Sequence, residues 1–173
     1  MFRKLSMHQL NRLTIYQYQS TEKRPFVLVL DNVRSLNNVG SIFRSADGFG
    51  LSHIYLGGIT GTPPHRDIHK TALGAENSIP WTHAADTAAI CKQLKADGYT
   101  LIAVEQVEGS TMLQDFKADK TQKTAIVFGN EVDGVNEDVL ALCDHCIEIP
   151  QFGTKHSFNV SVCAGIILWE LLK

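Results

Sequence analysis

Three segments of the sequence carry clusters of polar residues directly after apolar runs, at residues 31–44, 129–134 and 149–162. They contain asparagine, serine and glycine beside the charged Arg44 and Glu131. If each apolar run is a strand of an open α/β sheet, the segments meet beyond the carboxyl ends of the strands, where such sheets bind ligands. The pattern therefore predicts one site built from all three segments.

Several familiar chemistries lack their motifs in this chain. The sequence has no Walker loop and no G-x-G-x-x-G after a strand, and Gly57, Gly58 and Gly61 reproduce neither spacing. The G-x-S-x-G elbow of hydrolases is also missing. Cys143 and Cys146 form a C-x-x-C pair, but no second pair supplies the two further ligands that a zinc site needs. We therefore expect no metal site, no nucleoside triphosphate hydrolysis and no dinucleotide redox chemistry.

Apolar runs of strand length alternate with stretches of helical spacing along the chain. The runs predict strands at 26–30, 53–56, 99–104, 125–128 and 145–149, and the spacing predicts helices at 39–46, 66–74, 84–97, 135–143 and 157–172. Weaker helical spacing covers 3–13, and 14–24 is expected to be a polar connector. Because strands that are apolar on both faces alternate with helices, we expect an α/β fold with a mainly parallel sheet flanked by helices.

The length of 173 residues, of which 44% are apolar, suits a single folded domain. We place this domain at 25–173, after an N-terminal helical extension at 1–24. No stretch approaches the ~18 apolar residues of a membrane span, and the N-terminus lacks the apolar core of a signal peptide. The four cysteines are too scattered for a secreted disulfide framework. We therefore expect a cytoplasmic protein without a membrane partner.

Charge is distributed unevenly along the chain, although the whole carries only −2. Residues 1–70 have a net charge of +5, residues 71–103 of −1 and residues 104–173 of −6. A basic first third can form a local anion-binding face on a nearly neutral protein. An uneven solvated surface accounts for the same numbers, so charge alone does not decide between a binding face and ordinary surface.

Three ordered motifs carry a resemblance to a known family. They are Asn38-x-Gly40-x3-Arg44 after a strand, Phe128-Gly129-Asn130-Glu131, and Ile149-Pro150 followed by Ser157-x-Asn159-Val160-Ser161-Val162. In this order and strand context, the chain from about residue 26 to its end resembles the SpoU (TrmH) family of SPOUT-class RNA methyltransferases. The resemblance implies methyl transfer from S-adenosylmethionine to a ribose 2′-hydroxyl of tRNA or rRNA, with tRNA favoured for so short a chain. It also implies a homodimer and a deep C-terminal trefoil knot.

The resemblance also implies which residues bind the methyl donor: Val104, Gly129, Ile149 and Phe158. A glycine allows the backbone to approach a flat ring closely, and apolar side chains beside backbone polar groups suit an adenosine pocket. The family usually carries leucine where this chain has Phe158. We therefore expect a larger ring to narrow the adenine pocket.

Arg44 is the residue that we expect to act in catalysis, on the basis of the same resemblance. Its permanently charged guanidinium suits the stabilisation of negative charge on the attacking ribose oxygen better than it suits proton abstraction. Glu131 or an RNA phosphate then accepts the proton. An ordinary alternative is a surface ion pair between Arg44 and Asp47, three residues along the same helix.

Four further residues of the motifs are expected to support Arg44: Asn38, Glu131, Ser157 and Asn159. They would fix the loops around it and orient its side chain. Asn38 and Ser157 also suit the N-caps of the two helices that begin near them, a structural role that is compatible with the functional one.

RNA contacts are expected from the basic first third, at Arg12, Arg24, Arg34, Arg66 and Lys70. Phosphate contacts of this kind weaken as salt concentration rises. The alternative function is a knotted RNA-binding dimer that no longer methylates, for which Phe158 is the one hint in the sequence. A third hypothesis is a small α/β nucleotide-binding enzyme outside the family, but no motif in the sequence supports it.

Overall fold

The structure is a computed structural model and describes residues 2–6 and 8–173. In this part of the chain, one sheet contains seven strands in the order β3-β2-β1-β6-β4-β7-β5, and all neighbouring strands are parallel. The strands are β1 (Arg24–Asp31), β2 (Leu51–Gly57), β3 (Trp81–Ala84), β4 (Thr100–Val104), β5 (Thr111–Met112), β6 (Thr124–Phe128) and β7 (His145–Glu148). The predicted α/β fold with a mainly parallel sheet is confirmed.

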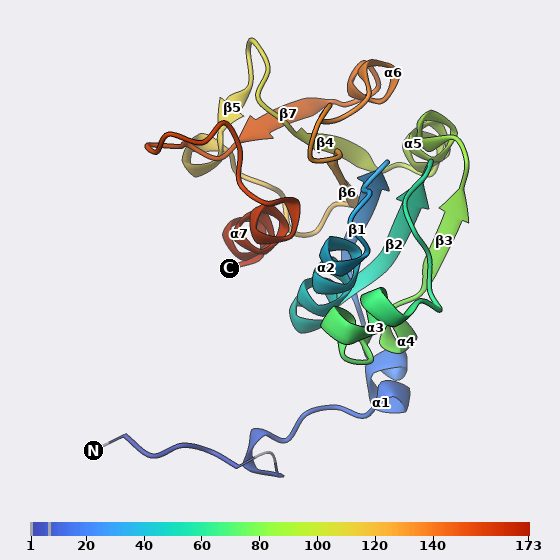
Figure 1. Cartoon of the computed structure of the whole chain (residues 1–173), viewed down its shortest axis with the longest axis vertical. Helices are drawn as coiled ribbons and strands as arrows, with labels where there is room; N and C mark the ends of the chain where they lie inside the picture. The colour runs from blue at the N-terminus through green and yellow to red at the C-terminus, as the bar shows by residue number, and fades with distance from the viewer. Residues whose placement is uncertain (1, 7) are drawn as a thin grey trace.

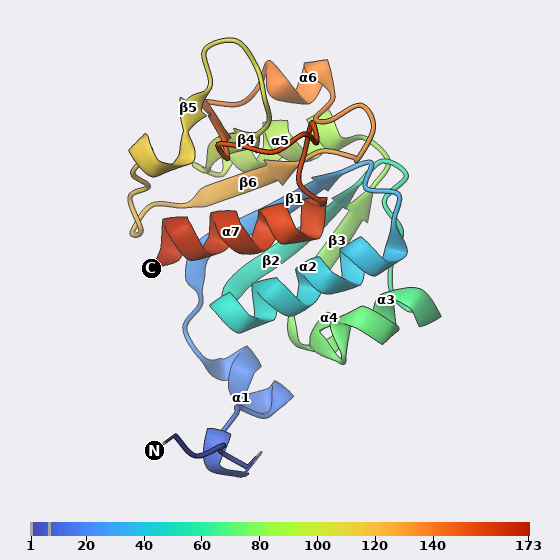
Figure 2. The ribbon, with the colours of Figure 1, turned by 60° about the vertical axis from the view of Figure 1, so that its left-hand side comes forward.

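Helices cover both faces of the sheet (Figures 1 and 2). The α-helices are α1 (Ile15–Ser20), α2 (Leu36–Phe49), α3 (Arg66–Ala72), α4 (Ala75–Ser78), α5 (Thr87–Ala96), α6 (Glu137–Leu140) and α7 (Val160–Leu172). Helices α2 and α7 lie side by side on one face (Figure 2), and α5 and α6 pack on the other.

The alternation of side chains along β1 explains why its sequence is apolar throughout. Phe26, Leu28 and Leu30 point into the core beneath α2 and α7, whereas Val27 and Val29 point into the core beneath α5 and α6. All five are at most 1% exposed. A strand buried on both faces needs apolar residues at every position, which is why the unbroken run predicted the strand correctly.

Several element boundaries differ from the sequence-based expectations. The connector expected at 14–24 contains α1, which begins at a capping box in which Thr14 and Gln17 bind each other's backbone N–H groups. The predicted helix at 3–13 is wrong for the described residues, where only His8–Leu10 form a short 3-10 helix; Met7 lies outside them. The segment expected as one helix from Ala84 contains the end of β3 before α5 begins.

The N-terminal segment leads away from the body of the molecule (Figures 1 and 2). It joins the domain at Tyr18, which is 8% exposed and donates a hydrogen bond from its hydroxyl to the carbonyl of Leu51. Arg24, at the amino end of β1, donates to the carbonyl of Leu172 at the end of α7 at 2.8 Å. These contacts lie at the amino ends of the strands.

The carboxyl ends of the central strands carry the loops that build the site. Asp31, at the end of β1, is 1% exposed, and its Oδ2 accepts a hydrogen bond from the backbone N–H of Asn136 at 2.8 Å. Its Oδ1 accepts a second bond from Asn32. A carboxylate this deeply buried is tolerated because hydrogen-bond donors bind its oxygens. Asp31 thereby fixes the loop after β1 to the loop after β6.

Candidate functional site

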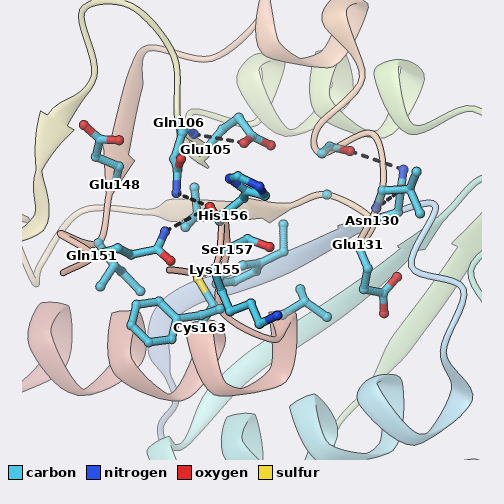
Figure 3. A pocket seen from close by; sticks show the side chains of 18 residues that line it. Glu105, Gln106, Asn130, Glu131, Glu148, Gln151, Lys155, His156, Ser157 and Cys163 are labelled. Carbon is cyan, nitrogen blue, oxygen red and sulfur yellow. Dashed lines mark hydrogen bonds between the residues drawn. The ribbon is translucent and has the colours of Figure 1, made fainter. Parts of the chain in front are cut away.

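A cavity of about 670 Å³ opens where the segments after β4, β6 and β7 meet the start of α7 (Figure 3). The four residues predicted to bind the methyl donor all line it: Val104, Gly129, Ile149 and Phe158. Its volume falls within the ~300–1,000 Å³ that is typical of small-molecule sites. The cavity thus lies at the carboxyl ends of the strands, where the polar segments predicted a ligand site.

The cavity wall formed by residues 129–134 depends on two glycines. Asn130 and Gly134 exchange backbone hydrogen bonds of 3.1 and 3.2 Å, which close a tight turn. A Cβ atom on Gly129 would overlap the backbone of Gly134. Gly134 itself has φ of +71°, a region that favours glycine. The turn can therefore fold back onto the end of β6.

Side-chain amides join the three motifs beside the cavity. Asn38 Nδ2 donates to Glu131 Oε1 at 2.6 Å, and Asn159 Nδ2 donates to Asn38 Oδ1 at 3.1 Å. Glu131 and Ser157 also line the cavity (Figure 3). The structure thus brings together four of the five predicted catalytic residues, from α2, the loop after β6 and the loop before α7.

The N-caps of the two helices differ from expectation. Ser35, and not Asn38, caps α2, because the Ser35 hydroxyl accepts a hydrogen bond from the backbone N–H of Asn38. Asn159, and not Ser157, caps α7 by accepting from the backbone N–H of Ser161 at 3.0 Å. The capping roles expected of Asn38 and Ser157 are therefore wrong. The Asn38 side chain is used for Glu131 instead.

Arg44 does not line the cavity within this chain. It lies six residues after Asn38, so at 3.6 residues per turn the two side chains are about 120° apart round the helix axis. That places it on the side of α2 that carries Gly40, which packs against Ile68 of α3, and its own side chain is exposed. In the described part of the chain no ion pair joins it to Asp47. Its catalytic role stays a prediction.

The residues expected to contact RNA divide into two groups. Arg34, Arg66 and Lys70 lie on exposed loops and helix α3; Arg34 pairs with Asp133 at 3.3 Å with both side chains more than half exposed. Arg12 lies instead in the N-terminal segment and Arg24 at the amino end of β1, whereas the cavity lies at the carboxyl ends of the strands. The structure therefore does not bring Arg12 and Arg24 near the cavity.

Glu105 and Gln106 are among the cavity residues outside the three segments predicted to form the site, whereas Lys155 and His156 lie within the third segment. Glu105 and Gln106 follow β4 directly, and Lys155 and His156 precede Ser157 in the last loop (Figure 3). Glu105 and Gln106 show the same signal as the other polar segments, a polar pair at the carboxyl end of an apolar strand. Lys155 and His156 place positive or titratable groups beside a cavity that also contains carboxylates.

The cysteines are unsuited to nucleophilic chemistry. All four are free, and burial raises the pKa of the Cys91 and Cys163 thiols to about 12 and that of Cys143 to about 11. Cys163, which lines the cavity, is therefore a neutral thiol at ordinary pH. Among residues 2–6 and 8–173 no group of three or more metal-ligating side chains gathers, and no helix has the length and apolar content to cross a bilayer.

Residues 25–169 match the SpoU rRNA Methylase family, so the chain belongs to this family. The family resemblance of the three motifs is thereby confirmed. A curated relative, the 23S rRNA (guanosine-2'-O-)-methyltransferase RlmB of Vibrio parahaemolyticus, is 31% identical over 165 residues, which is 95% of this chain and 66% of the relative. The RlmB protein of Escherichia coli is 29% identical over 150 residues, 87% of this chain and 60% of the relative. The chain thus spans about two thirds or less of these relatives.

Solved structures agree with the sequence comparison. An rRNA methyltransferase from Sinorhizobium meliloti with bound AdoMet superposes with a TM-score of 0.79 at 28% identity, covering 86% of this chain and 56% of that one. The SpoU methyltransferase AviRb from Streptomyces viridochromogenes, also in complex with AdoMet, gives a TM-score of 0.77 at 25% identity, covering 88% and 61%.

Proposed function

We propose that this chain transfers a methyl group from S-adenosylmethionine to a ribose 2′-hydroxyl of RNA. One observation carries the proposal: the cavity lined by Gly129, Ile149 and Phe158 lies directly beside the hydrogen-bonded cluster of Asn38, Glu131 and Asn159. A binding pocket for the donor and polar groups for the acceptor hydroxyl are thus adjacent. Membership of the SpoU family supports the same reaction.

The residues around the cavity fit the methyl donor. Ile149 and Phe158 offer apolar walls for an adenine ring, and Val104 and Gly129 line the same cavity at the end of β4 and directly after β6. Phe158 is 42% exposed and leaves a cavity of about 670 Å³, so its larger ring does not fill the pocket. When bound, the donor supplies an electrophilic methyl group on a positively charged sulfur.

Glu131 is the group that we expect to orient and deprotonate the ribose hydroxyl. One of its oxygens is held by Asn38 at 2.6 Å, which leaves the other oxygen available to accept a hydrogen bond. Asn159 holds Asn38 by a hydrogen bond from its Nδ2 atom. The Asn159 side chain is itself held in place because its Oδ1 atom caps α7. Arg44 is exposed on α2 and does not line this chain's cavity, so its proposed role, stabilising the negative charge on the ribose oxygen, requires the cavity of a second copy in the proposed homodimer.

A homodimer and a knotted chain complete the proposal. Val162 and Trp169 on the outer side of α7 are 52% and 63% exposed, and a second copy of this chain is the partner that we propose to cover them. The proposed knot is supported by the last loop, which contacts Gln106 after β4 and Asn38 of α2 before α7 begins. A cytoplasmic location follows from an RNA substrate and stays a prediction.

The direct test combines purified protein, isotope-labelled S-adenosylmethionine, and either tRNA or rRNA, followed by mass spectrometry of the nucleosides. We expect label in 2′-O-methylated nucleosides, with tRNA favoured over rRNA as substrate. The names of the two curated relatives refer to 23S rRNA, so the assay must include both tRNA and rRNA. A non-catalytic RNA-binding dimer predicts no label and no heat when the protein is titrated with S-adenosylmethionine.

A further inference from the structure

Glu105 and Gln106 occupy the turn that follows β4, and both line the cavity (Figure 3). The mechanism above does not use them. The backbone of Glu105 is fixed to β7, because its N–H donates to the carbonyl of Ile147 at 3.1 Å and its carbonyl accepts from the Cys146 thiol. The pair is therefore tied directly to the sheet, whereas Gly129 and Phe158 on the two walls lie in loops.

The Glu105 carboxylate binds two backbone N–H groups. Its Oε1 accepts from Gln106 at 2.9 Å and its Oε2 accepts from Val135 at 2.9 Å. A Cβ atom on Gly134 would overlap this carboxylate, so glycine is needed for the approach as well as for its positive φ. Hydrogen bonds to a carboxylate are roughly twice as strong as those between neutral groups. Glu105 thus holds the turn that carries the Gly129 wall.

The Gln106 side chain holds the opposite wall. Its Nε2 donates to the carbonyl of His156 at 3.1 Å, and Gln151 Nε2 donates to the same carbonyl at 3.3 Å. Both bonds brace the loop between β7 and α7, which contains Ile149 and Phe158. Two adjacent residues after β4 therefore tie together the two loops between which the cavity lies.

We propose that Glu105 and Gln106 are positioning residues that set the separation of the two walls and hence the affinity for the methyl donor. This inference rests on the proposed function, since it concerns the same cavity. Neither residue takes part in proton transfer or methyl transfer. Their removal therefore weakens donor binding and raises the KM for the donor, while kcat at saturating donor is retained.

The first test replaces Glu105 with glutamine, which preserves size but offers only one acceptor oxygen and turns an NH₂ group toward the second backbone N–H. We expect the dissociation constant for S-adenosylhomocysteine, measured by calorimetry, to rise about tenfold, the effect of losing one charge-assisted hydrogen bond. Hydrogen exchange of the Val135 amide should accelerate in the same variant. The kcat at saturating donor should stay within about twofold of the parent value.

Asp144→Asn is the matched control. The Asp144 carboxylate also accepts a backbone N–H, from Leu101 at 2.9 Å, but at the amino-terminal part of β4. If Glu105→Gln and Asp144→Asn weaken donor binding equally, the effect is one of general stability and the inference is wrong.

Gln106→Ala provides a second variant in case Glu105→Gln fails to fold. The Gln106 side chain is exposed, so its removal leaves no polar group unsatisfied in the core. It should also raise the donor dissociation constant and leave kcat unchanged; an unchanged dissociation constant in Gln106→Ala overturns the inference. If the parent protein itself binds neither S-adenosylmethionine nor S-adenosylhomocysteine, the proposed function fails instead, and the two failures are thereby distinguished.

Discussion

Asn38 and Ser35 stand three residues apart at the start of α2 and allow activity to be separated from stability. The Asn38 side chain bridges Glu131 and Asn159, whereas the Ser35 side chain caps the helix. Asn38→Ala removes both side-chain bonds of the bridge and leaves the cap intact. We therefore expect it to impair the reaction without unfolding the helix.

The magnitude follows from the bond between Asn38 and Glu131. A hydrogen bond to a charged group contributes about 1.5–3 kcal/mol, so kcat/KM for RNA should fall about 10- to 150-fold in Asn38→Ala. The free energy of unfolding should change by no more than about 0.5 kcal/mol, because alanine is the better helix former and the site is only half-buried.

Ser35→Ala should behave in the opposite way. Loss of an N-cap costs about 1 kcal/mol of stability, which corresponds to a melting midpoint lower by about 2–4 °C in a protein of this size. Its kcat/KM should stay within a few-fold of the parent value. Calorimetric melting and methyl-transfer kinetics on both variants check the assignment. A melting midpoint of Asn38→Ala lowered by about 2–4 °C, together with normal turnover, would refute the assigned role of Asn38.

Three further outcomes are expected. Arg44→Ala should lose about 3–4 kcal/mol of transition-state stabilisation in kcat with an unchanged melting midpoint; near-normal turnover of the folded variant would remove Arg44 from the mechanism. Trp169→Arg places a charge on the exposed face of α7 and should shift the protein from dimer to monomer in light scattering, whereas an unchanged mass argues against this face as the interface. Burial raises the pKa of Cys91 and Cys163 to about 12, so the stability that their neutral thiols contribute is complete below pH ~9 and is lost as pH rises toward 12. Denaturant unfolding at pH 8 and pH 10.5 measures this loss, which Cys163→Ala should reduce.

The strands that build the site were predictable, and the edge strands were not. The unbroken apolar sequences of β1, β4 and β6 reflect burial on both faces, and each was expected within two residues of its observed bounds. By contrast, β3 reads Trp-Thr-His-Ala and is at most half-buried, while β5 has two exposed residues. Edge strands are held by backbone pairing to one neighbour, which leaves little trace in side-chain pattern.

Helix limits were overestimated where a capping residue lies inside the apolar pattern. The helix expected at 135–143 is observed only as α6, and its start is set by Asn136, whose side chain caps it by accepting from the backbone N–H of Asp138. Likewise α7 begins after Asn159 rather than at 157. In both places an asparagine side chain caps the helix, although the residue lies inside the apolar pattern.

The difference between Asn38 and Arg44 shows what motif spacing leaves undetermined. Both residues belong to one motif, and α2 contains both of them. A separation of six residues nevertheless places their side chains about 120° apart round that helix. Asn38 therefore faces Glu131, while Arg44 faces outward beside Gly40 and α3. A motif fixes the order of chemical groups along the chain, but the direction of each group depends on which side of the helix packs against the sheet. For α2 that side is set by Val39, Ile42, Phe43 and Ala46, all fully buried, and their positions leave Arg44 no route into this chain's own core.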